Sequence, residues 1–402
     1  MKILQINAVG QSSSTGRTCA ELAQYINTNT EHQCYTAFSV GTLDEYGYRI
    51  GSRRDARIHG LLSRLTGRQA HFSRAATKKL LRYMKQLEPD VVHLRNLHAN
   101  YLHFPMLMKY LAQEKIPTVI TLHDCWFFTG KCCHYTMTGC DRWKTGCHHC
   151  PRLHKDNASW FIDASSILWK EKKALFEALP SLTVTGVSDW TIQQAEESFL
   201  VCAKEMQRIY NWIDLDVFCL QEPDRQLREK YAPNGQKIVL GVASGWSAAK
   251  GLDEVLMLAR RLGEAYVVCV VGTITENIEL PENVYNIPPT SSVGELAKLY
   301  AMADVLVNCS PEETFGKVSA EALACGTPVV CYDSTANKEL VGTGCGAVHP
   351  LGDLEGMEQS VRQICSQGKD AFCAACRSFA EENFRKEDRI RDYLALYEKI
   401  KA

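Results

Sequence analysis

Short apolar runs alternate with amphipathic stretches along most of the chain. The runs are rich in Val, Ile and Leu and lie at 2–9, 89–94, 118–122, 182–187, 238–243, 266–271, 284–287, 303–307 and 329–331. Such runs are typical of strands buried on both faces of a parallel sheet. Residues 18–27, 317–325 and 386–400 have apolar side chains at helical spacing. This alternation predicts an α/β fold with parallel sheets.

The most informative stretch runs from Asn308 to Asp333. The predicted strand 303–307 is followed by a loop with Gly316 and by the predicted helix 317–325, and Gly326 and Pro328 follow that helix. The loop therefore lies at the carboxyl end of a strand, where open α/β sheets bind their ligands. A phosphate group facing the Gly316 turn would meet the N-terminus of the helix.

Two carboxylates flank this turn, Glu313 before it and Glu321 on the predicted helix. Partly helical geometry between them allows a separation of up to about 12 Å. That separation suits one ligand with hydroxyl groups at both ends and a diphosphate between them. The alternative interpretation is a solvated loop carboxylate and a glutamate on the helix surface.

The string from Glu313-Thr314-Phe315-Gly316 to Glu321, followed by Ala322-Leu323-Ala324-Cys325-Gly326-Thr327-Pro328-Val329, resembles the E-x7-E signature of family 4 retaining glycosyltransferases. These enzymes have the GT-B architecture, two Rossmann-like domains that face a central cleft. The resemblance implies that Glu313 contacts the donor sugar and Glu321 the ribose hydroxyls. The donor-binding residues that it implies are Gly16, Lys250, Glu313, Thr314, Phe315, Gly316, Lys317, Val318 and Glu321, and the catalytic ones are His123, Glu313 and Lys250.

A glycine loop at 10–17 joins the first strand to the helix predicted at 18–27. Its backbone amides can face a phosphate, although such loops often only connect strand to helix. The resemblance places Gly16 at the loop glycine near the donor diphosphate and Lys250 at the lysine that helps to neutralise it. Many family 4 members carry an Arg five residues before that Lys, where this chain has Gly245. We expect Trp246 or another residue to compensate.

A second group of polar residues follows two strands of the first half of the chain. His123 and Asp124 come directly after the strand 118–122, and His98 follows the strand 89–94. Polar residues at strand ends of a parallel sheet are in a position to form a site. The strings TLHDCW and HLRNLH resemble family 4 enzymes of colanic acid and other exopolysaccharide biosynthesis, which implies an acceptor-side role for His98 and Asp124.

Residues 130–151 form a cysteine-rich insert. Cys133, Cys140, Cys147 and Cys150 follow the pattern C-x6-C-x6-C-x2-C, with Cys132 and three histidines as further ligand candidates. Four thiolates on a short loop match a closed structural zinc site, which leaves no coordination position open for catalysis. Free thiols or a disulfide are the alternatives, and a reducing compartment would disfavour the disulfide.

The segment 51–87 is strongly basic. Its only acidic residue is Asp55, against the basic residues Arg53, Arg54, Arg57, Arg64, Arg68, Arg74, Lys78, Lys79, Arg82 and Lys85. Leucines at helical spacing predict amphipathic helices here. These helices either pack on the core with a solvated outer face or present a surface to anionic lipid or to a pyrophosphate-linked acceptor.

The bulk properties limit the class of protein. The chain has 402 residues and a formal net charge of −1, which predicts two to three domains and disfavours a nucleic-acid binder. It contains no apolar run of 18 residues, and its start lacks the apolar region of a signal peptide. We therefore expect a cytoplasmic location, including peripheral attachment to the inner face of the membrane, and reduced cysteines.

Together these observations and the resemblance predict a first Rossmann-like acceptor-side domain at 1–206, a nucleotide-sugar-binding domain at 207–385 and a helix at 386–402 that returns to the first domain. The expected reaction transfers a hexosyl unit from a nucleotide diphosphate sugar to a saccharide, for which lipid linkage is expected, with retention and without a catalytic cofactor. Exopolysaccharide, capsule or O-antigen synthesis would use it. The alternatives are an epimerase or phosphorylase on the same fold, an inactive sugar-nucleotide-binding protein, and a zinc or redox protein centred on the insert.

Overall fold

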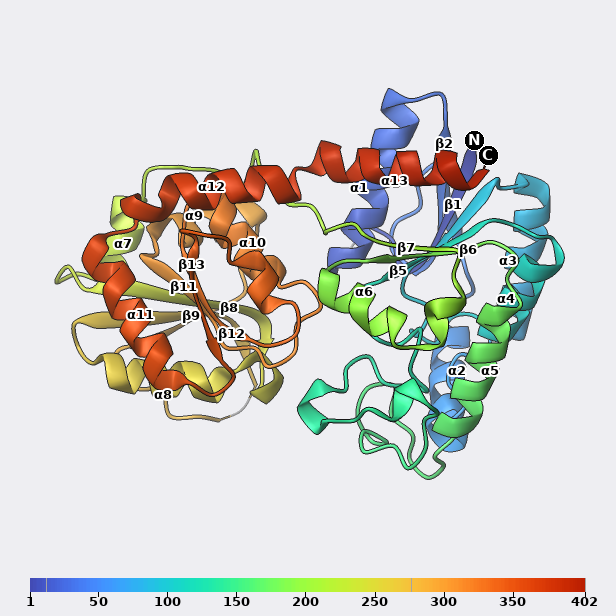
Figure 1. Cartoon of the computed structure of the whole chain (residues 1–402), viewed down its shortest axis with the longest axis horizontal. Helices are drawn as coiled ribbons and strands as arrows, with labels where there is room; N and C mark the ends of the chain where they lie inside the picture. The colour runs from blue at the N-terminus through green and yellow to red at the C-terminus, as the bar shows by residue number, and fades with distance from the viewer. Residues whose placement is uncertain (12, 276, 402) are drawn as a thin grey trace. The chain divides into compact units, whose positions relative to one another are not determined.

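The computed structural model describes residues 1–11, 13–275 and 277–401. The chain forms two compact units (Figure 1). Unit 1 contains Met1–Ile209 and Ile390–Ala402, and unit 2 contains Tyr210–Arg389. Each unit is built on its own parallel sheet, with seven strands in unit 1 and six in unit 2. The predicted α/β class with two Rossmann-like domains is confirmed.

Unit 1 has the sheet order β3-β2-β1-β4-β5-β6-β7. Its strands are β1 (Lys2–Val9), β2 (Gln33–Val40), β3 (Gly47–Arg49), β4 (Val91–Leu94), β5 (Thr118–Leu122), β6 (Leu182–Gly186) and β7 (Glu205–Arg208). Its helices are α1 (Ser13–Asn29), α2 (Arg53–Thr66), α3 (Arg74–Leu87), α4 (Phe104–Gln113), α5 (Ser165–Glu177) and α6 (Asp189–Glu196), with short 3₁₀ turns η1 (Thr136–Thr138), η2 (Arg142–Lys144) and η3 (Phe199–Cys202). The helix α13 (Lys386–Lys401) completes the unit from Ile390 onward.

The final helix is bonded to the centre of this sheet. The Tyr397 hydroxyl lies 2.6 Å from Nδ1 of His93 on β4, and the Tyr393 hydroxyl lies 3.2 Å from the Thr121 hydroxyl on β5. Lys401 also forms an ion pair with Asp90, 3.1 Å between Nζ and Oδ1. These contacts attach the last residues of the chain to strands that lie some 270 to 300 positions earlier in the sequence.

Unit 2 has the sheet order β10-β9-β8-β11-β12-β13. Its strands are β8 (Lys237–Trp246), β9 (Tyr266–Ile274), β10 (Val284–Ile287), β11 (Val305–Asn308), β12 (Val329–Asp333) and β13 (Gly346–Pro350). Its helices are α7 (Arg225–Tyr231), α8 (Leu252–Leu262), α9 (Val293–Met302), α10 (Lys317–Ala324), α11 (Leu354–Gln367) and α12 (Asp370–Phe384), with 3₁₀ turns η4 (Ala248–Lys250) and η5 (Asn337–Leu340).

The apolar runs became strands because both faces of each sheet are covered. All four residues of β4 and of β11 are buried, and so are all five residues of β5. The predicted bounds of the strands 2–9, 118–122 and 284–287 match those of β1, β5 and β10. The strand β2 was not predicted, since its sequence QCYTAFSV mixes polar and apolar residues.

One local prediction was wrong. The helix α1 begins at Ser13, so Gly16 lies inside its first turn and not in a loop. A Cβ atom at Gly16 would lie 1.8 Å from the carbonyl oxygen of Gly10. Close packing of the helix on the preceding loop therefore requires glycine at this position.

Candidate active site

The loop between β11 and α10 carries the predicted donor-binding residues. Gly316 has φ 85° and caps the N-terminus of α10, a left-handed conformation that favours glycine. The Glu313 amide donates to the Thr335 hydroxyl at 2.8 Å, and the Ala336 amide donates to the Glu313 carbonyl at 3.2 Å. The segment after β12 thus holds the Glu313 loop at the carboxyl end of the sheet.

Glu313 forms an ion pair with Lys250. The distance between Oε1 and Nζ is 2.6 Å, and the two side chains are 16% and 37% exposed. Lys250 ends η4, which follows β8, and β8 is the neighbour of β11 in the sheet. Gly251 has φ 68°, and a Cβ there would lie 2.3 Å from the carbonyl oxygen of Cys309. This close approach brings the Lys250 turn to the end of β11, which leads to Glu313.

Glu321 lies in the second turn of α10 and is only 7% exposed. Its Oε2 accepts a hydrogen bond of 3.0 Å from the Tyr300 hydroxyl of α9, and Lys317 Nζ lies 3.9 Å from its Oε1. Burial, followed by the Glu321 charge, raises the pKa of Tyr300, so the phenol stays protonated and donates. The alternative interpretation of Glu321 as a solvated surface residue is therefore wrong.

Tyr300 was not predicted as part of the site. It lies 21 residues before Glu321 on a different helix, at a position where an apolar face explains an aromatic residue equally well. Only the packing of α9 beside α10 shows that its hydroxyl meets the carboxylate.

The other residues of the turn differ in exposure. Thr314, Lys317 and Val318 are partly exposed. Phe315 is buried, with its ring centroid 5.8 Å from that of Tyr210 and 5.6 Å from that of Phe384. Phe315 can therefore offer a ligand only its main chain, while its side chain fixes the loop to the core of unit 2.

Trp246 does not compensate for the arginine expected at position 245. Its side chain is 5% exposed, and its Nε1 donates to the Val271 carbonyl at 3.0 Å within the core. Gly245 itself is exposed, and a Cβ atom there would meet nothing within 4 Å. The structure thus corrects the expectation for Trp246 and leaves room for a side chain at 245.

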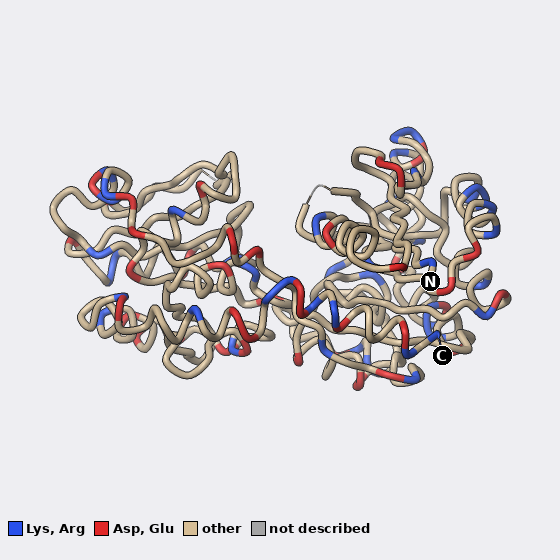
Figure 2. The backbone as a smooth tube through the Cα atoms, turned by 90° about the horizontal axis from the view of Figure 1, so that it is seen from above, with Lys and Arg blue, Asp and Glu red and all other residues tan. Residues whose placement is uncertain are grey.

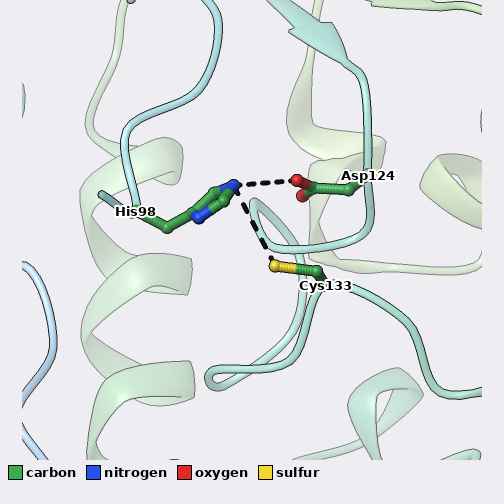
Figure 3. A group of neighbouring side chains, drawn as sticks. All are labelled: His98, Asp124 and Cys133. Atoms are coloured by element: carbon green, nitrogen blue, oxygen red, sulfur yellow. Dashed lines mark hydrogen bonds and ion pairs between the residues drawn. The ribbon is translucent and has the colours of Figure 1, made fainter. Parts of the chain in front are cut away.

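In unit 1 the predicted acceptor-side residues meet at the carboxyl ends of β4 and β5. His98 Nε2 lies 2.8 Å from Asp124 Oδ2, as Figure 3 shows. The second oxygen of Asp124 accepts from the Trp126 amide at 2.8 Å. Burial raises the pKa of Asp124, but the His98 charge and these hydrogen bonds outweigh burial and hold it at about 2. The carboxylate is therefore ionised at neutral pH and orients His98.

His123 lies beside Arg95 in the same region, with 3.3 Å between His123 Nε2 and Arg95 Nη1. Arg95 is fully buried, and its guanidinium carbon lies 5.4 Å from the centroid of the Tyr393 ring. Burial, and then the Arg95 charge, lowers the pKa of His123 to about 3. The imidazole of His123 is therefore neutral at physiological pH, with one nitrogen that donates and one that accepts hydrogen bonds.

The cysteines of the insert separate into two groups. Cys132, Cys140, Cys147 and Cys150 line one small cavity. Cys133, which the spacing had grouped with the last three, points to His98 instead, with 3.9 Å between Sγ and Nε2 (Figure 3). The structure thus differs from the predicted ligand set, because Cys132 faces the cavity while Cys133 faces His98.

The arrangement in unit 2 is suited to a doubly charged, hydroxylated ligand. It offers two carboxylates, which accept from hydroxyl groups, and a lysine beside one of them. Between the carboxylates lies a glycine turn at a helix N-terminus, which favours phosphate. No residue near Glu313 stands out as a covalent nucleophile in the part of the chain that the structure describes.

Comparisons with known proteins show what the chain is similar to. The model "Glycosyltransferase Family 4" matches residues 15–217, and the model "Glycosyl transferases group 1" matches residues 223–382. WcaC of Escherichia coli (strain K12), a glycosyl transferase named for colanic acid biosynthesis, is 25% identical over 78% of this chain and 77% of its own length. N-acetyl-alpha-D-glucosaminyl L-malate synthase of Bacillus anthracis is 24% identical over 53% of this chain, which spans 58% of that relative.

A crystal structure of a glycosyltransferase from Rickettsia africae ESF-5 has the same fold. Its TM-score is 0.70 at 17% identity, with 99% of this chain and 98% of that chain covered. The two sheets of this chain are therefore those of the GT-B architecture. With one family model covering its first half and the other its second, the chain belongs to glycosyltransferase family 4, whose enzymes retain anomeric configuration and use nucleotide diphosphate sugars.

Proposed function

We propose that this chain transfers a hexosyl unit from a nucleotide diphosphate sugar to a saccharide acceptor with retention at the anomeric carbon. The observation that carries this proposal is the Glu313–Lys250 ion pair of 2.6 Å beside the Gly316 turn. The buried Glu321 lies in the second turn of the helix that this turn begins. Family membership supports the reaction class. That the transferred unit is a hexose is part of the proposal.

Each group in unit 2 then has a role. The Glu321 carboxylate accepts hydrogen bonds from the ribose hydroxyls, and Tyr300 holds that carboxylate in place. Glu313 binds hydroxyl groups of the transferring sugar. Lys250 and the amides that follow Gly316 neutralise the diphosphate as it leaves, the kind of electrostatic stabilisation that contributes most in such reactions. In this scheme the transfer requires no cofactor.

Unit 1 supplies the acceptor side in this proposal. His98, oriented by Asp124 at 2.8 Å, and the neutral His123 offer hydrogen bonds to acceptor or sugar hydroxyls. The family resemblance supports a place for Gly16 near the donor diphosphate, while the close packing of α1 on the Gly10 carbonyl explains why the residue is glycine. The main function of these groups is positioning.

We infer a saccharide acceptor that is linked to lipid, in exopolysaccharide, capsule or O-antigen synthesis. The similarity to WcaC, at 25% identity, supports the polysaccharide context. The surface of α2 supports the inference that the acceptor is linked to lipid. Its residues Ile58, Leu61 and Leu65 lie one turn apart and are 59%, 48% and 37% exposed, among exposed arginines.

The loop after the cysteine-rich insert adds to this surface. Trp160, Phe161 and Ile162 are 46%, 73% and 51% exposed. The Trp160 amide donates to the Arg64 carbonyl at 2.8 Å, which attaches this loop to the end of α2. Exposed aromatic and aliphatic side chains close to exposed arginines suit the interface of an anionic membrane. We therefore propose peripheral attachment to the inner face of a membrane through this surface. In the described part of the chain, none of the helices is long and apolar enough to span a bilayer.

The helix α3 has a different surface. Its apolar residues Leu80, Met84 and Leu87 are buried in the core of unit 1, while its lysines and arginines are exposed. It therefore offers charge without exposed apolar area. Figure 2 marks the lysines and arginines of the chain in blue along the backbone. Of the two basic helices, α2 is the one that we propose inserts shallowly.

Product analysis tests the proposed reaction. The purified chain is incubated with UDP-, GDP- and ADP-hexoses, with and without saccharide acceptors, and the anomeric configuration of the product is determined by NMR. Acceptor-dependent transfer with retention is the expected result. Isomerised donor without transfer would indicate an epimerase. Phosphate-dependent release of sugar phosphate would indicate a phosphorylase. Donor binding without turnover would indicate an inactive binding protein.

A further inference from the structure

The cysteine-rich insert encloses a small cavity within unit 1. The thiols of Cys132, Cys140, Cys147 and Cys150 line it together with Lys131 and Trp143. The cavity measures about 20 Å³, which is room for about one water-sized particle. Four cysteines are the ligand set of a closed tetrahedral zinc site.

Main-chain hydrogen bonds hold these thiols in position. The Gly130 amide donates to Cys147 Sγ at 3.2 Å, and the Cys150 amide donates to Asp163 Oδ2 at 2.8 Å. A Cβ atom at Gly130 would lie 2.6 Å from the Ser165 carbonyl oxygen. Glycine therefore lets the insert pack closely on the start of α5. An amide aimed at sulfur stabilises a thiolate more than a thiol, because the thiolate is the better acceptor.

Two buried lysines hold the main chain in and around the insert. Lys131 and Lys172 are 3% and 4% exposed. Lys131 Nζ donates to the Arg152 and Leu153 carbonyls at 3.1 and 2.6 Å, and Lys172 Nζ donates to the Trp126 and Thr129 carbonyls at 2.6 and 3.0 Å. Across residues 1–11, 13–275 and 277–401, the hydrogen bonds of these two groups go to carbonyls rather than to carboxylates.

Four cysteines around one small cavity, one of them accepting from the Gly130 amide, offer the ligands that a structural zinc ion prefers. We infer that Cys132, Cys140, Cys147 and Cys150 bind one structural zinc ion. On binding, the four thiols release four protons, four Zn–S bonds form, and no redox change occurs.

The fold of the insert gives the metal a structural task. Between β5 and α5 the described chain has only the short turns η1 and η2 as regular structure. The insert is tied to the segment that follows Asp124, since the Cys125 amide donates to the Cys133 carbonyl at 2.8 Å. A zinc ion would thus stabilise the segment that carries Asp124. With all four ligands supplied by thiolates, no coordination position remains open for catalysis.

Cys133 belongs to a different group. Its Sγ, His98 Nε2 and a carboxylate oxygen of Asp124 all lie within 4.8 Å of one another, a spacing at which three groups could hold a metal ion. Yet His98 and Asp124 already bond each other at 2.8 Å, and Asn157 Nδ2 lies 3.6 Å from Cys133 Sγ. These side chains satisfy one another as hydrogen-bonding groups. Cys133 is therefore the matched control for the proposed zinc site, one residue from Cys132.

The test is elemental analysis of the full chain purified without chelator. We expect about one zinc per chain in the wild type and in Cys133→Ser, and loss of most of it in Cys132→Ser and Cys140→Ser. Donor affinity, which depends on unit 2, should change less than about threefold in the soluble variants. Zinc retained by Cys132→Ser but lost from Cys133→Ser would assign the metal to His98 and Asp124 and overturn the inference.

Two measurements on the wild type need no cysteine variant. A mercurial titration should release the zinc as about four thiols react per metal, and cobalt substitution should give the intense visible absorption of a tetrahedral thiolate site. Metal-free wild type, or iron with its own visible absorption in place of zinc, would contradict the proposal. Loss of zinc with transfer products unchanged in type would leave the proposed glycosyltransferase function standing.

Discussion

Lys250 and Glu313 form an ion pair of 2.6 Å that joins the turn after β8 to the loop after β11. Both residues were predicted separately, one for the diphosphate and one for the sugar, and the structure shows that they bond each other. The Lys250 side chain is 37% exposed, so the pair adds little to stability. Its value lies in orienting the carboxylate and in placing a cation where phosphate charge develops.

The first prediction concerns this pair. Lys250→Gln and Glu313→Gln should each lower kcat at least about 100-fold, because a positioned charge is lost from the transition state. The free energy of unfolding should change by less than about 1 kcal/mol. Arg261→Gln is the matched control, since Arg261 forms a similar ion pair with Glu358, at 2.6 Å, away from the loop. Steady-state kinetics measures kcat, and urea unfolding measures the free energy of unfolding. A variant with full activity but reduced stability would show that the pair has only a structural role.

The second prediction concerns the ribose. Glu321→Ala should weaken donor binding about 10- to 100-fold, since a charge-assisted hydrogen bond contributes roughly 1.5–3 kcal/mol. Tyr300→Phe keeps the carboxylate but removes the donor at 3.0 Å that orients it. It should weaken donor binding by a smaller factor and leave the pH profile of kcat in place. Isothermal titration with the donor measures both, and unchanged affinity in Glu321→Ala would show that the nucleotide binds elsewhere.

The strands at the centre of both sheets could be predicted because burial on both faces leaves a continuous apolar run in the sequence. The edge strand β7 (Glu205–Arg208) leaves no such run, since its sequence is EMQR and it is only partly buried. The site was predicted in the same partial way. A signature string identified Glu313 and Glu321, whereas Tyr300 and the core position of Trp246 depend on how separate elements pack. Neither spacing nor composition could distinguish Cys132 from Cys133, since only the fold decides which way each thiol points.

The third prediction uses the open position at Gly245. A side chain there would meet no atom within 4 Å of its Cβ, so Gly245→Arg should fold normally and place a cation near the Lys250 turn. Donor affinity should rise about threefold to tenfold, in line with one added charge-assisted contact to phosphate. Gly245→Gln serves as the control for side-chain size without charge. If arginine and glutamine have the same effect on the donor dissociation constant, position 245 does not face the diphosphate.

The fourth prediction is that acid destabilises unit 1 before its carboxylates titrate. His59 is fully buried, and burial, followed by the charges of His103 and His71, lowers its pKa to about 4. The unfolded chain binds this proton below about pH 6.5, while the folded chain does not. Stability is therefore complete above about pH 6.5 and is lost as pH falls toward 4, by up to about 3 kcal/mol for this group.

Urea unfolding at several pH values between about 7.5 and 4.5 measures this loss. His59→Phe removes the titrating group and should flatten the pH dependence, whatever its effect on stability at neutral pH. Burial also lowers the pKa of His103 to about 4, so part of the slope should remain in the variant. An unchanged slope in His59→Phe would mean that His59 is protonated in the folded chain as readily as in the unfolded one.

The last prediction separates the two basic helices. Replacing Arg53, Arg54, Arg57 and Arg64 of α2 with Gln should release the protein from vesicles that contain anionic lipid. Each Lys or Arg near such a surface contributes about 1 kcal/mol, so four changes should lower the partition coefficient up to about 1,000-fold. The same number of charges removed from α3, at Lys78, Lys79, Arg82 and Lys85, should have a smaller effect, because α3 buries its apolar residues. Phe161→Ser, which keeps every charge, should also weaken binding, since that side chain is 73% exposed at the end of α2.

Sedimentation with neutral and anionic vesicles at several salt concentrations tests all three variants, and donor affinity should be equal in each. Equal losses for the α2 and α3 sets, with no effect of Phe161→Ser, would mean that general charge rather than the α2 surface attracts the protein to lipid.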